Sequence, residues 1–451
     1  MVFPTPRHKF RLLDPLWTSH HRHVTSRASL AADGNAMRAW MRYLASHGMG
    51  RALRHPNYAR FAGWGFVSTL GYWVQRLGIQ WLVWDLTHSY VWLAGIALAE
   101  AGVILAAMPM AGSLADRFDR LFIARATQAA SLAIAAVLGV TAVLGFATPQ
   151  LLVVFVALMA LSDAFWTPAR LAMVPNLLPR EDLMPALSLM AFSFNTAQML
   201  GPALAGLILL HADVGYAFLF NALTYLFFLA ALYRIRLRPS GLGAKAVRGF
   251  IADFTAGIGY IRRHRLILML LVLGTCVSML VRPYRELLAG YADELFALGA
   301  PGFSALASAS GAGALLAAFI ASGAVKPARS LKPMFIGLGL AAAGLALFAA
   351  APRLGFAIAV AASAGLAFLA TFIAIQGQVM LQSIVPEDRR GRVMALWGAQ
   401  ARAGPPLGAW LVGMLAGAWS LPAALAVMAG VLLLLLFLMG RGWRADLGRE
   451  K

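Results

Sequence analysis

Residues Gly112-Ser113-Leu114-Ala115-Asp116-Arg117-Phe118-Asp119-Arg120 lie between two long apolar runs and combine small residues with four charged side chains. Charged side chains enter hydrocarbon only at a cost of several kcal/mol, so these charges fix the points at which the two flanking helices end. Gly112 permits the two helices to approach each other closely. The stretch therefore predicts a tight charged loop between two membrane-spanning helices, and a point about which the helices could hinge.

The composition of the whole chain is that of an integral membrane protein. Of its 451 residues 61% are hydrophobic and only 12% are charged, whereas about 25% of the residues of soluble domains are charged. A net charge of +20 would suggest nucleic-acid binding in a soluble protein, but in a membrane protein the sign depends on where the charges lie relative to the spans. We therefore expect a lipid bilayer and no nucleic acid as partner.

The sequence contains few features that indicate a metal site, a cofactor site or an enzyme. The single cysteine, Cys276, excludes an internal disulfide framework and a cysteine-based metal site. His20, His21 and His23 are expected to belong to a solvated tail rather than to a metal site. No phosphate-binding loop, His-Glu-x-x-His pattern or nucleophile elbow occurs in the sequence. We expect a protein that is not an enzyme and needs neither metal nor cofactor.

Twelve apolar runs are long enough to cross a bilayer, because about 20 helical residues span about 30 Å of hydrocarbon. The sequence thus predicts an all-α membrane protein with twelve transmembrane helices. The runs lie near residues 61–84, 91–113, 121–145, 150–172, 184–210, 214–235, 266–290, 303–324, 333–350, 354–382, 392–417 and 420–440.

Basic residues accumulate in every second connection, and Arg353 alone falls in the connections between them. Because Lys and Arg are retained on the cytoplasmic side, both termini are expected in the cytoplasm. The basic residues concerned are Arg117, Arg120, Arg125, Arg170, Arg180, Arg234, Arg236, Arg238, Lys245, Arg248, Arg262, Arg263, Arg265, Lys326, Arg329, Lys332, Arg389, Arg390 and Arg392.

The longest connection divides the spans six and six. It contains apolar residues at a spacing of three to four, from Phe250 to Ile261, so we expect an amphipathic helix on the inner membrane surface, with a solvated linker as the alternative. The expected domains are a basic cytoplasmic tail (1–56), a first six-helix bundle (57–235), the cytoplasmic loop (236–265), a second six-helix bundle (266–440) and a short cytoplasmic tail (441–451).

An internal repeat supports this division. Residues of the first half recur in the second at offsets that drift from 207 to 211: Gly201 with Gly408, Gly206 with Gly413, Arg76 with Arg285, Gly102 with Gly313, and Gly112 with Gly323. Glycine and arginine matches are harder to obtain by chance than matches between alanine- and leucine-rich helices. We interpret these matches as two parallel repeats of six helices each.

The loop from Gly112 to Arg120 resembles the Gly-x-Leu-x-Asp-Arg-x-x-Arg signature of the major facilitator superfamily. Residues 54–440 as a whole resemble the enterobactin-exporter-like subgroup of its efflux permeases, with two departures: Gln80 stands near a position that is often acidic, and the second signature loop, residues 323–329, is degenerate. The matching stretches are Gln75-Arg76, Trp81-Leu82-Val83, Leu86-Thr87-His88-Ser89, Asp163 to Arg170, Gly201 to Gly206, Arg282-Pro283-Tyr284-Arg285 and Arg390-Gly391-Arg392-Val393.

This resemblance implies the major facilitator fold, with two pseudo-symmetric six-helix bundles and alternating access. It also implies a monomeric, multi-pass protein of the bacterial inner membrane. The implied function is secondary active transport, most simply proton-coupled export of a siderophore-like, drug-like or other amphiphilic small molecule. The alternatives are a lysophospholipid or nutrient importer of the same fold, and a transport-inactive scaffold or sensor.

Ionisable residues within the spans are candidates for proton coupling or substrate contact, since a charge near mid-membrane is costly unless it is paired or hydrated. Glu100 and Arg76 lie about 18 and 22 Å from the inner ends of their helices, so they could pair; a proton carrier and a fixed structural ion pair are both open. Asp163 is the next candidate carrier. Arg402 could contact an anionic substrate or serve as an alternative partner of Glu100.

Other residues are candidates for gating. The resemblance implies that Asp116 pairs with Arg170 and with the amino end of the eleventh helix, and Gly201 and Pro202 could let the fifth helix bend. The complete gating set is Gly112, Asp116, Arg117, Arg120, Arg170, Gly201, Pro202, Arg282, Arg285 and Glu286. Aromatic side chains available for a cavity are Trp64, Tyr72, Trp73, Trp81, Trp84, Phe165, Trp166 and Trp397, of which Trp84, like Trp92, is expected in the interfacial belt.

Overall fold

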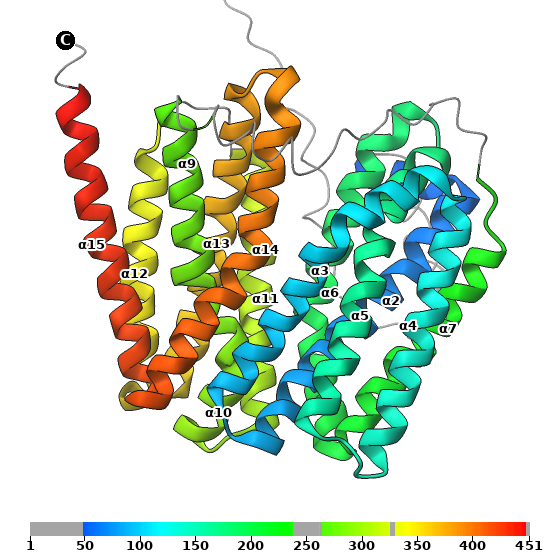
Figure 1. Ribbon diagram of the computed structural model, residues 1–451, viewed down its shortest axis with the longest axis horizontal. Coiled ribbons are helices and arrows are strands. Elements are labelled where there is room, and N and C mark those ends of the chain that lie inside the picture. The colour runs from blue at the N-terminus through cyan, green and yellow to red at the C-terminus, as the bar shows by residue number, and fades with distance from the viewer. Residues whose placement is uncertain (1–47, 238–260, 262–263, 325–329, 448–451) are drawn as a thin grey trace, which may run out of the picture.

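The computed structural model describes residues 48–237, 261, 264–324 and 330–447, and these residues are almost entirely helical (Figure 1). The first half contains the 3₁₀ segment η1 (Gly48–Arg54), then α2 (Pro56–Thr87), α3 (Tyr90–Arg117), α4 (Arg120–Val143), α5 (Pro149–Met173), the 3₁₀ segments η2 (Val174–Asn176) and η3 (Arg180–Asp182), α6 (Leu183–His211) and α7 (Val214–Tyr233). The second half contains α9 (Arg265–Cys276), η4 (Val277–Val281), η5 (Arg282–Leu287), α10 (Leu288–Phe296), α11 (Gly299–Ala324), α12 (Lys332–Leu354), α13 (Phe356–Ile384), α14 (Glu387–Ala418) and α15 (Leu421–Leu447).

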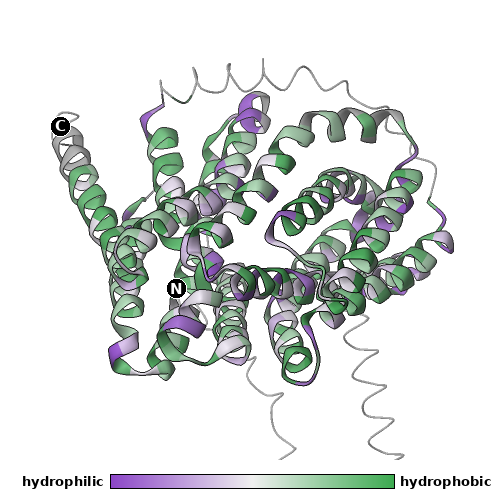
Figure 2. Cartoon of the chain, turned by 60° about the horizontal axis from the view of Figure 1, so that its bottom comes forward, coloured by the Kyte–Doolittle hydropathy of each residue, from purple (hydrophilic) through white to green (hydrophobic). Residues whose placement is uncertain are grey.

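These elements make twelve spans when α9, η4, η5 and α10 are taken as one interrupted helix. Ten of the spans among the described residues are long and apolar enough to cross a membrane on composition alone. The other two, α2 and α14, are 32 residues each but carry polar side chains such as Arg76 and Arg402. Figure 2 shows hydrophobic residues along most of the helices and hydrophilic residues mainly near their ends and in the interior.

Short connections with capping residues separate the spans. The side chains of Asp119 and Asp213 accept hydrogen bonds from the backbone amides of Leu121 and Gly215, at 2.9 and 2.8 Å. Thr148 caps α5 in the same way and is followed by Pro149, which is well tolerated at the first position of a helix. Local sequence therefore ends one helix and begins the next within a few residues.

The opening stretch of sequence is more helical than expected. Residues Gly112 to Arg117 form the last turns of α3, and Arg120 already begins α4, so that only Phe118 and Asp119 connect the helices. The expectation of a nine-residue loop was therefore wrong, because charged residues at the end of a helix can reach water without ending its hydrogen bonding. Outside the described residues lie the expected amphipathic helix of the central loop up to residue 260, residues 325–329 of the second signature loop, and His20, His21 and His23.

The end of the expected tail is docked on the first bundle. Arg51 and His55 both form ion pairs with Asp182, with His55 Nε2 2.7 Å from Asp182 Oδ2. Tyr58, which follows in α2, is completely buried and donates a hydrogen bond to the carbonyl oxygen of Ala186. Packing against the start of α6 thus begins before the first span.

The two halves meet mainly through two helix pairs, α6 with α11 and α3 with α14. The repeat relates these pairs to each other. A Cβ added at Gly206 of α6 would lie 2.5 Å from the side chain of Ser304 in α11, and one added at Gly413 of α14 would lie 2.8 Å from the carbonyl oxygen of Tyr90 in α3. The repeat-related glycines thus permit close contact at equivalent positions of the two pairs.

The second pair of matched glycines packs within each half in the same way. A Cβ at Gly201 would meet Trp73 of α2, and one at Gly408 would meet Met279 and Pro283 of the seventh span. The first and seventh spans are counterparts in the repeat. The fold is therefore an all-α bundle of two pseudo-symmetric six-helix halves, as the sequence predicts.

Two ends of the bundle are distinguished below. The basic end is the one at which α2 begins and α3 ends, and it carries Arg120, Arg125, Arg180, Arg234, Arg236, Arg265, Lys332, Arg389, Arg390 and Arg392. The far end is the opposite one, where the connections after α2, α4 and α12 lie.

Candidate functional site: a charged cavity between the two halves

The main cavity lies in the middle of the bundle, chiefly against the first half, and has a volume of about 350 Å³. Its wall is formed by side chains of α2, α3, α4, α5, α6 and α7, with Glu286 and Arg402 contributed by the second half. Cavities of about 300–1,000 Å³ hold drug-sized ligands. The main cavity therefore has the size and position of a transport site.

The lining reaches toward the basic end. It includes Phe61 and Arg170, which are five residues after the start of α2 and three residues before the end of α5, together with Phe228 near the end of α7. At a rise of 1.5 Å per residue these side chains lie within about two turns of the basic end.

At the far end the two halves are in contact beyond the cavity. Trp84 Nε1 donates to Asp293 Oδ2 at 2.9 Å, joining α2 to α10. Gly290 lies against the rings of Trp84 and Tyr90, and a Cβ there would lie 2.5 Å from either ring. The structure is thus closed at the far end. Trp84 is only 2% exposed, so its expected place in the interfacial belt was wrong: the indole forms part of this contact.

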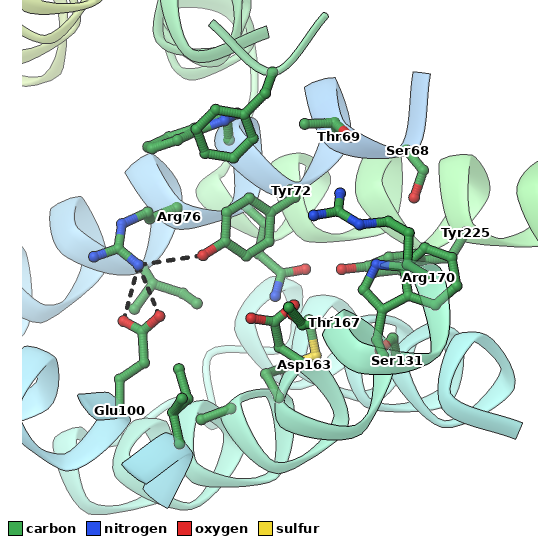
Figure 3. Close-up of a pocket in the computed structure, with 18 of the residues that line it drawn as sticks. Ser68, Thr69, Tyr72, Arg76, Glu100, Ser131, Asp163, Thr167, Arg170 and Tyr225 are labelled. Carbon is green, nitrogen blue, oxygen red and sulfur yellow. Dashed lines mark hydrogen bonds and ion pairs between the residues drawn. The ribbon is translucent and has the colours of Figure 1, made fainter. Parts of the chain in front are cut away.

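An ion-pair network crosses the cavity near the middle of the spans (Figure 3). Arg76 Nη1 donates to both carboxylate oxygens of Glu100, at 2.8 and 2.9 Å, and to the hydroxyl of Tyr72 at 3.3 Å. Its Nη2 atom lies 3.4 Å from Glu286 Oε1, in the other half of the protein. The predicted pairing of Arg76 with Glu100 is therefore present, and Arg76 links it to the second half.

Gln80 takes part in this network. Its Nε2 atom donates to Glu286 Oε2 at 2.8 Å. In the exporter-like subgroup that this chain resembles, an acidic residue often stands near the position of Gln80. In this protein the acidic side chain at that place is Glu286, which belongs to the seventh span. Glu286 therefore binds two side chains of α2, Arg76 and Gln80.

Asp163, Arg170 and Arg402 all line the main cavity. The guanidinium groups of Arg76, Arg170 and Arg402 line the same cavity as the carboxylate of Asp163. The close-up shows Asp163 on the same side of the cavity as Thr167 (Figure 3). Arg402 contributes a guanidinium from the second half, but no ion pair with Glu100 is present among the described residues. The candidates for coupling and substrate contact therefore share one cavity.

Several buried polar atoms of this wall have no partner among the described residues. Arg170 Nε and Trp73 Nε1 are donors of this kind, and Gln128 Oε1 is an acceptor. Buried polar groups without a partner are costly, so water or a ligand is expected to satisfy them. The cavity thus offers hydrogen bonds as well as charge.

Aromatic and aliphatic side chains form most of the remaining wall. Of the aromatic residues singled out in the sequence, Tyr72, Trp73 and Trp166 line the cavity, whereas Trp397 is packed against Gly274 and Gly377. The sequence did not indicate Phe61, Phe66, Phe194, Tyr225 and Phe228, which also line it. Helical periodicity does not distinguish a phenylalanine that faces a cavity from one that faces lipid.

The gating candidates fall in different places. Arg120 donates to the carbonyl oxygen of Ala172 at 3.1 Å and so joins the start of α4 to the end of α5. Gly201 packs on Trp73, while Pro202, Arg282 and Arg285 line a second cavity. The surroundings of Gly112 and the side chains of Asp116 and Arg117 lie outside the described part of the structure, and the gating roles of these residues stay predictions.

Comparison with known proteins assigns this chain to a family. Residues 52–445 match the family model described as transmembrane secretion effector. An enterobactin exporter of Shigella boydii is 26% identical over 406 residues, which is 86% of this chain and 94% of the exporter. A staphyloferrin A transporter of Staphylococcus aureus is 30% identical over 168 residues, which is 37% of this chain and 42% of that protein.

Solved structures show the same fold at low sequence identity. A bacterial homologue of the human lysosomal transporter Spinster, in an inward-facing and occupied conformation, superposes with a TM-score of 0.67 at 16% identity, covering 86% of this chain and 97% of the other. The nucleoside transporter NupG gives a TM-score of 0.62 at 15% identity, covering 84% of this chain and 97% of the other. With the family match over most of its length, the chain belongs to the transmembrane secretion effector family of the major facilitator superfamily, as a multi-pass transporter of small molecules homologous to siderophore exporters.

Proposed function

We propose that this protein is a proton-coupled exporter that moves a siderophore-like or similarly amphiphilic molecule out of the bacterial cytoplasm by alternating access. It acts as a monomer in the inner membrane, with both termini and the basic end in the cytoplasm. In this orientation the main cavity faces inward, ready to take up substrate from the cytoplasm.

The observation that carries the proposal is the Arg76 network. Glu100 is three-quarters buried, at 25% side-chain exposure, and shares a guanidinium with Glu286 of the other half. A buried carboxylate in a membrane protein is a functional candidate because it can exchange a proton at a moderate energetic cost. Since Arg76 contacts both halves, a change in the charge of Glu100 alters the attraction between them.

The exchange can be followed through this network. When Glu100 binds a proton that entered from the far side, Arg76 loses its bidentate partner and interacts chiefly with Glu286, which strengthens the contact between the halves. When Glu100 releases the proton to the cytoplasm, the pair with Arg76 forms again and substrate can enter. A ligand or proton shifts such an equilibrium only by as much as its affinities for the two states differ.

The wall of the cavity favours an amphiphilic substrate. Aromatic rings such as Tyr72, Trp73 and Trp166 provide apolar surface, and Asp163, Arg170 and Arg402 provide charge and hydrogen bonds. The named substrates of two relatives, enterobactin and staphyloferrin A, support a siderophore as the first compound to test.

The test is export of iron-free enterobactin in a bacterial host that lacks its own enterobactin exporter. We expect the full-length protein to restore secretion into the medium, and everted membrane vesicles to accumulate enterobactin when the pH gradient is formed. Collapse of the gradient by a protonophore should abolish accumulation.

A compound panel in a pump-deficient host extends the test to other amphiphilic molecules. Uptake into intact cells, rather than into everted vesicles, would establish an importer and contradict the proposed direction. Absence of flux for every compound, with normal insertion of the protein, would favour a scaffold or sensor.

A further inference from the structure

A second cavity lies beside the main one and carries an excess of positive charge. This side cavity, with a volume of about 160 Å³, shares Trp73, Arg76, Gln80 and Glu286 with the wall of the main cavity. Its remaining wall includes Arg282 and Arg285 of η5. Among its described lining residues, three guanidinium groups therefore face one carboxylate.

That carboxylate does not neutralise Arg282 or Arg285. Glu286 accepts from Gln80 at 2.8 Å and pairs with Arg76 at 3.4 Å, both on α2. No ion pair joins Arg282 or Arg285 to a carboxylate among the described residues. With its amide turned, Gln198 accepts from Arg285 Nη2 at 2.6 Å, but an amide carries no compensating charge.

The internal repeat explains the missing acid. Arg285 is the counterpart of Arg76, at an offset of 209, and the offset of 211 that relates Gly102 to Gly313 places Gly311 at the position of Glu100. A Cβ at Gly311 would lie 2.6 Å from Met199 Cα. The second half therefore has an arginine at this place in the repeat but, in place of the acid, a glycine that packs directly on the opposite half.

The backbone of the seventh span holds the two arginines in place. The span changes from α-helix to a π segment, η4, and then to the 3₁₀ segment η5, which begins with Arg282-Pro283. Tyr284 is buried and donates to the carbonyl oxygen of Ser363 at 2.9 Å. Pro283 packs on Gly408. Because Pro283 and Tyr284 fix one side of η5 against other helices, Arg282 and Arg285 on its other side line the side cavity. Interruptions of this kind are frequent at functional sites.

Arg282 and Arg285 are partly buried, and a guanidinium held away from water without a counter-charge is unfavourable, so an anion in the cavity would stabilise both. Arginine presents parallel N–H groups that match a carboxylate or another oxyanion. The volume of 160 Å³ is below that of cavities that enclose whole drug-sized ligands, about 300–1,000 Å³. The side cavity suits one acidic group of a larger molecule.

We propose that the side cavity binds the acidic group of the transported molecule, a carboxylate or similar oxyanion, while the apolar body of that molecule remains in the main cavity. The inference rests on the proposed transport function and specifies its substrates as amphiphilic acids. Arg282 and Arg285 are then determinants of specificity, and the wall shared by the two cavities is where the substrate crosses from one to the other.

The test compares 2-naphthoate with its uncharged amide, 2-naphthamide, in calorimetric titrations of the purified full-length protein. We expect wild-type protein to bind the acid about tenfold more tightly than the amide. Arg282→Gln and Arg285→Gln should each reduce this preference to about twofold, with little change in affinity for the amide. Arg285→Lys, which keeps the charge without the planar fork, should retain an intermediate preference.

The control is Arg353→Gln, which removes an exposed arginine outside both cavities, and its preference should equal that of the wild type. Gel-filtration profiles and unliganded melting temperatures establish that each variant is folded. Equal affinity of the wild type for acid and amide, or an undiminished preference in both glutamine variants, would overturn the proposal. Binding of inorganic sulfate as tight as that of 2-naphthoate would also overturn it, by showing a site for free anions.

Calorimetry needs no gradient, so the two proposals can fail separately. A preference for the acid in a protein that transports nothing leaves the binding site intact and removes the transport function. Export of 2-naphthoate that is unchanged in both glutamine variants leaves the transport function intact and removes this inference.

Discussion

The single residue on which the coupling proposal depends is Glu100. Its pairing with Arg76 could be predicted from the sequence, because depth in a membrane helix follows from the residue count and the rise per residue. The bridge from Arg76 to Glu286 could not, since it joins residues 210 positions apart in the chain and requires the seventh span to be interrupted. The sequence contained Pro283, but a proline does not fix the direction of the side chains that follow it.

We expect Glu100→Gln to abolish flux driven by a pH gradient, by tenfold or more, with insertion and melting temperature close to those of the wild type. The amide keeps the shape of the side chain and cannot exchange a proton. The measurement is enterobactin uptake into everted vesicles with an imposed pH gradient.

Glu181→Gln, which neutralises an exposed acid at the basic end, is the matched control and should transport normally. Coupled transport that survives in Glu100→Gln with its pH dependence intact would move the carrier elsewhere, and Asp163 would be the next residue to substitute.

At the scale of helices, the sequence predicted which glycines matter but not what they contact. The match of Gly206 with Gly413 indicated a repeat, and the structure shows that each of the two lies at a contact between the halves. Helix ends were less predictable. Charges at Asp116 and Arg117 suggested a loop, whereas α3 continues through them, because a helix can end in water several residues beyond the hydrocarbon.

Gly413→Ala is expected to weaken the contact between the halves at the far end. The added Cβ would lie 2.8 Å from the carbonyl oxygen of Tyr90, a backbone atom that cannot move aside cheaply, and overpacking of this kind costs about 1–3 kcal/mol. The population should therefore shift toward the state that is open at the far end. Gly417→Ala, one turn along α14 with no atom within 4 Å of its Cβ, should leave the distribution unchanged.

The measurement is the rate of maleimide labelling in a Cys276→Ser background, with one reporter cysteine at Phe66 in the main cavity and another at Ala307 in the side cavity. Gly413→Ala should slow labelling at position 66 and speed labelling at position 307. The opposite changes would contradict the assignment of this contact to the far-end closure.

At the scale of the whole molecule, composition and charge periodicity were sufficient to predict the number of spans and the two halves, and the resemblance of the signature motifs predicted the family. They could not predict which end of the cavity is closed, because that depends on a few contacts, such as Trp84 with Asp293, and one sequence must support both states. The sidedness of the protein in the membrane remains a prediction from the basic residues.

The topology can be tested with reporter fusions. Alkaline phosphatase fused after Ala147, in the connection between α4 and α5, should be active because it is periplasmic, whereas a fusion after Arg248 should be inactive in the cytoplasm. The reverse pattern of activities would invert the orientation, and with it the direction assigned to the main cavity.

Asp116→Asn is expected to shift the whole protein toward the inward-facing state. The resemblance to the signature loop implies that a carboxylate at this place favours the state in which the halves close at the basic end, by acting on the amino end of α14 and on Arg170. Such helix-terminus interactions contribute about 0.3–1 kcal/mol, and up to about 2 kcal/mol when partly buried. With the same two reporter cysteines, labelling should increase at position 66 and decrease at position 307, while calorimetric affinity for enterobactin is little affected.

The matched contacts at Gly206 and Gly413 also bear on the ancestry of the protein. In a twofold symmetric dimer every contact at the interface occurs twice, and the pairs α6–α11 and α3–α14 retain that pattern within one chain. A six-helix ancestor that assembled with a second copy of itself would have had both contacts before its gene was duplicated and fused. Fusion would then have freed the two copies to diverge, and they differ here, since the first half has Glu100 where the second has Gly311. The glycine contacts are common to the two halves, whereas the charges are not.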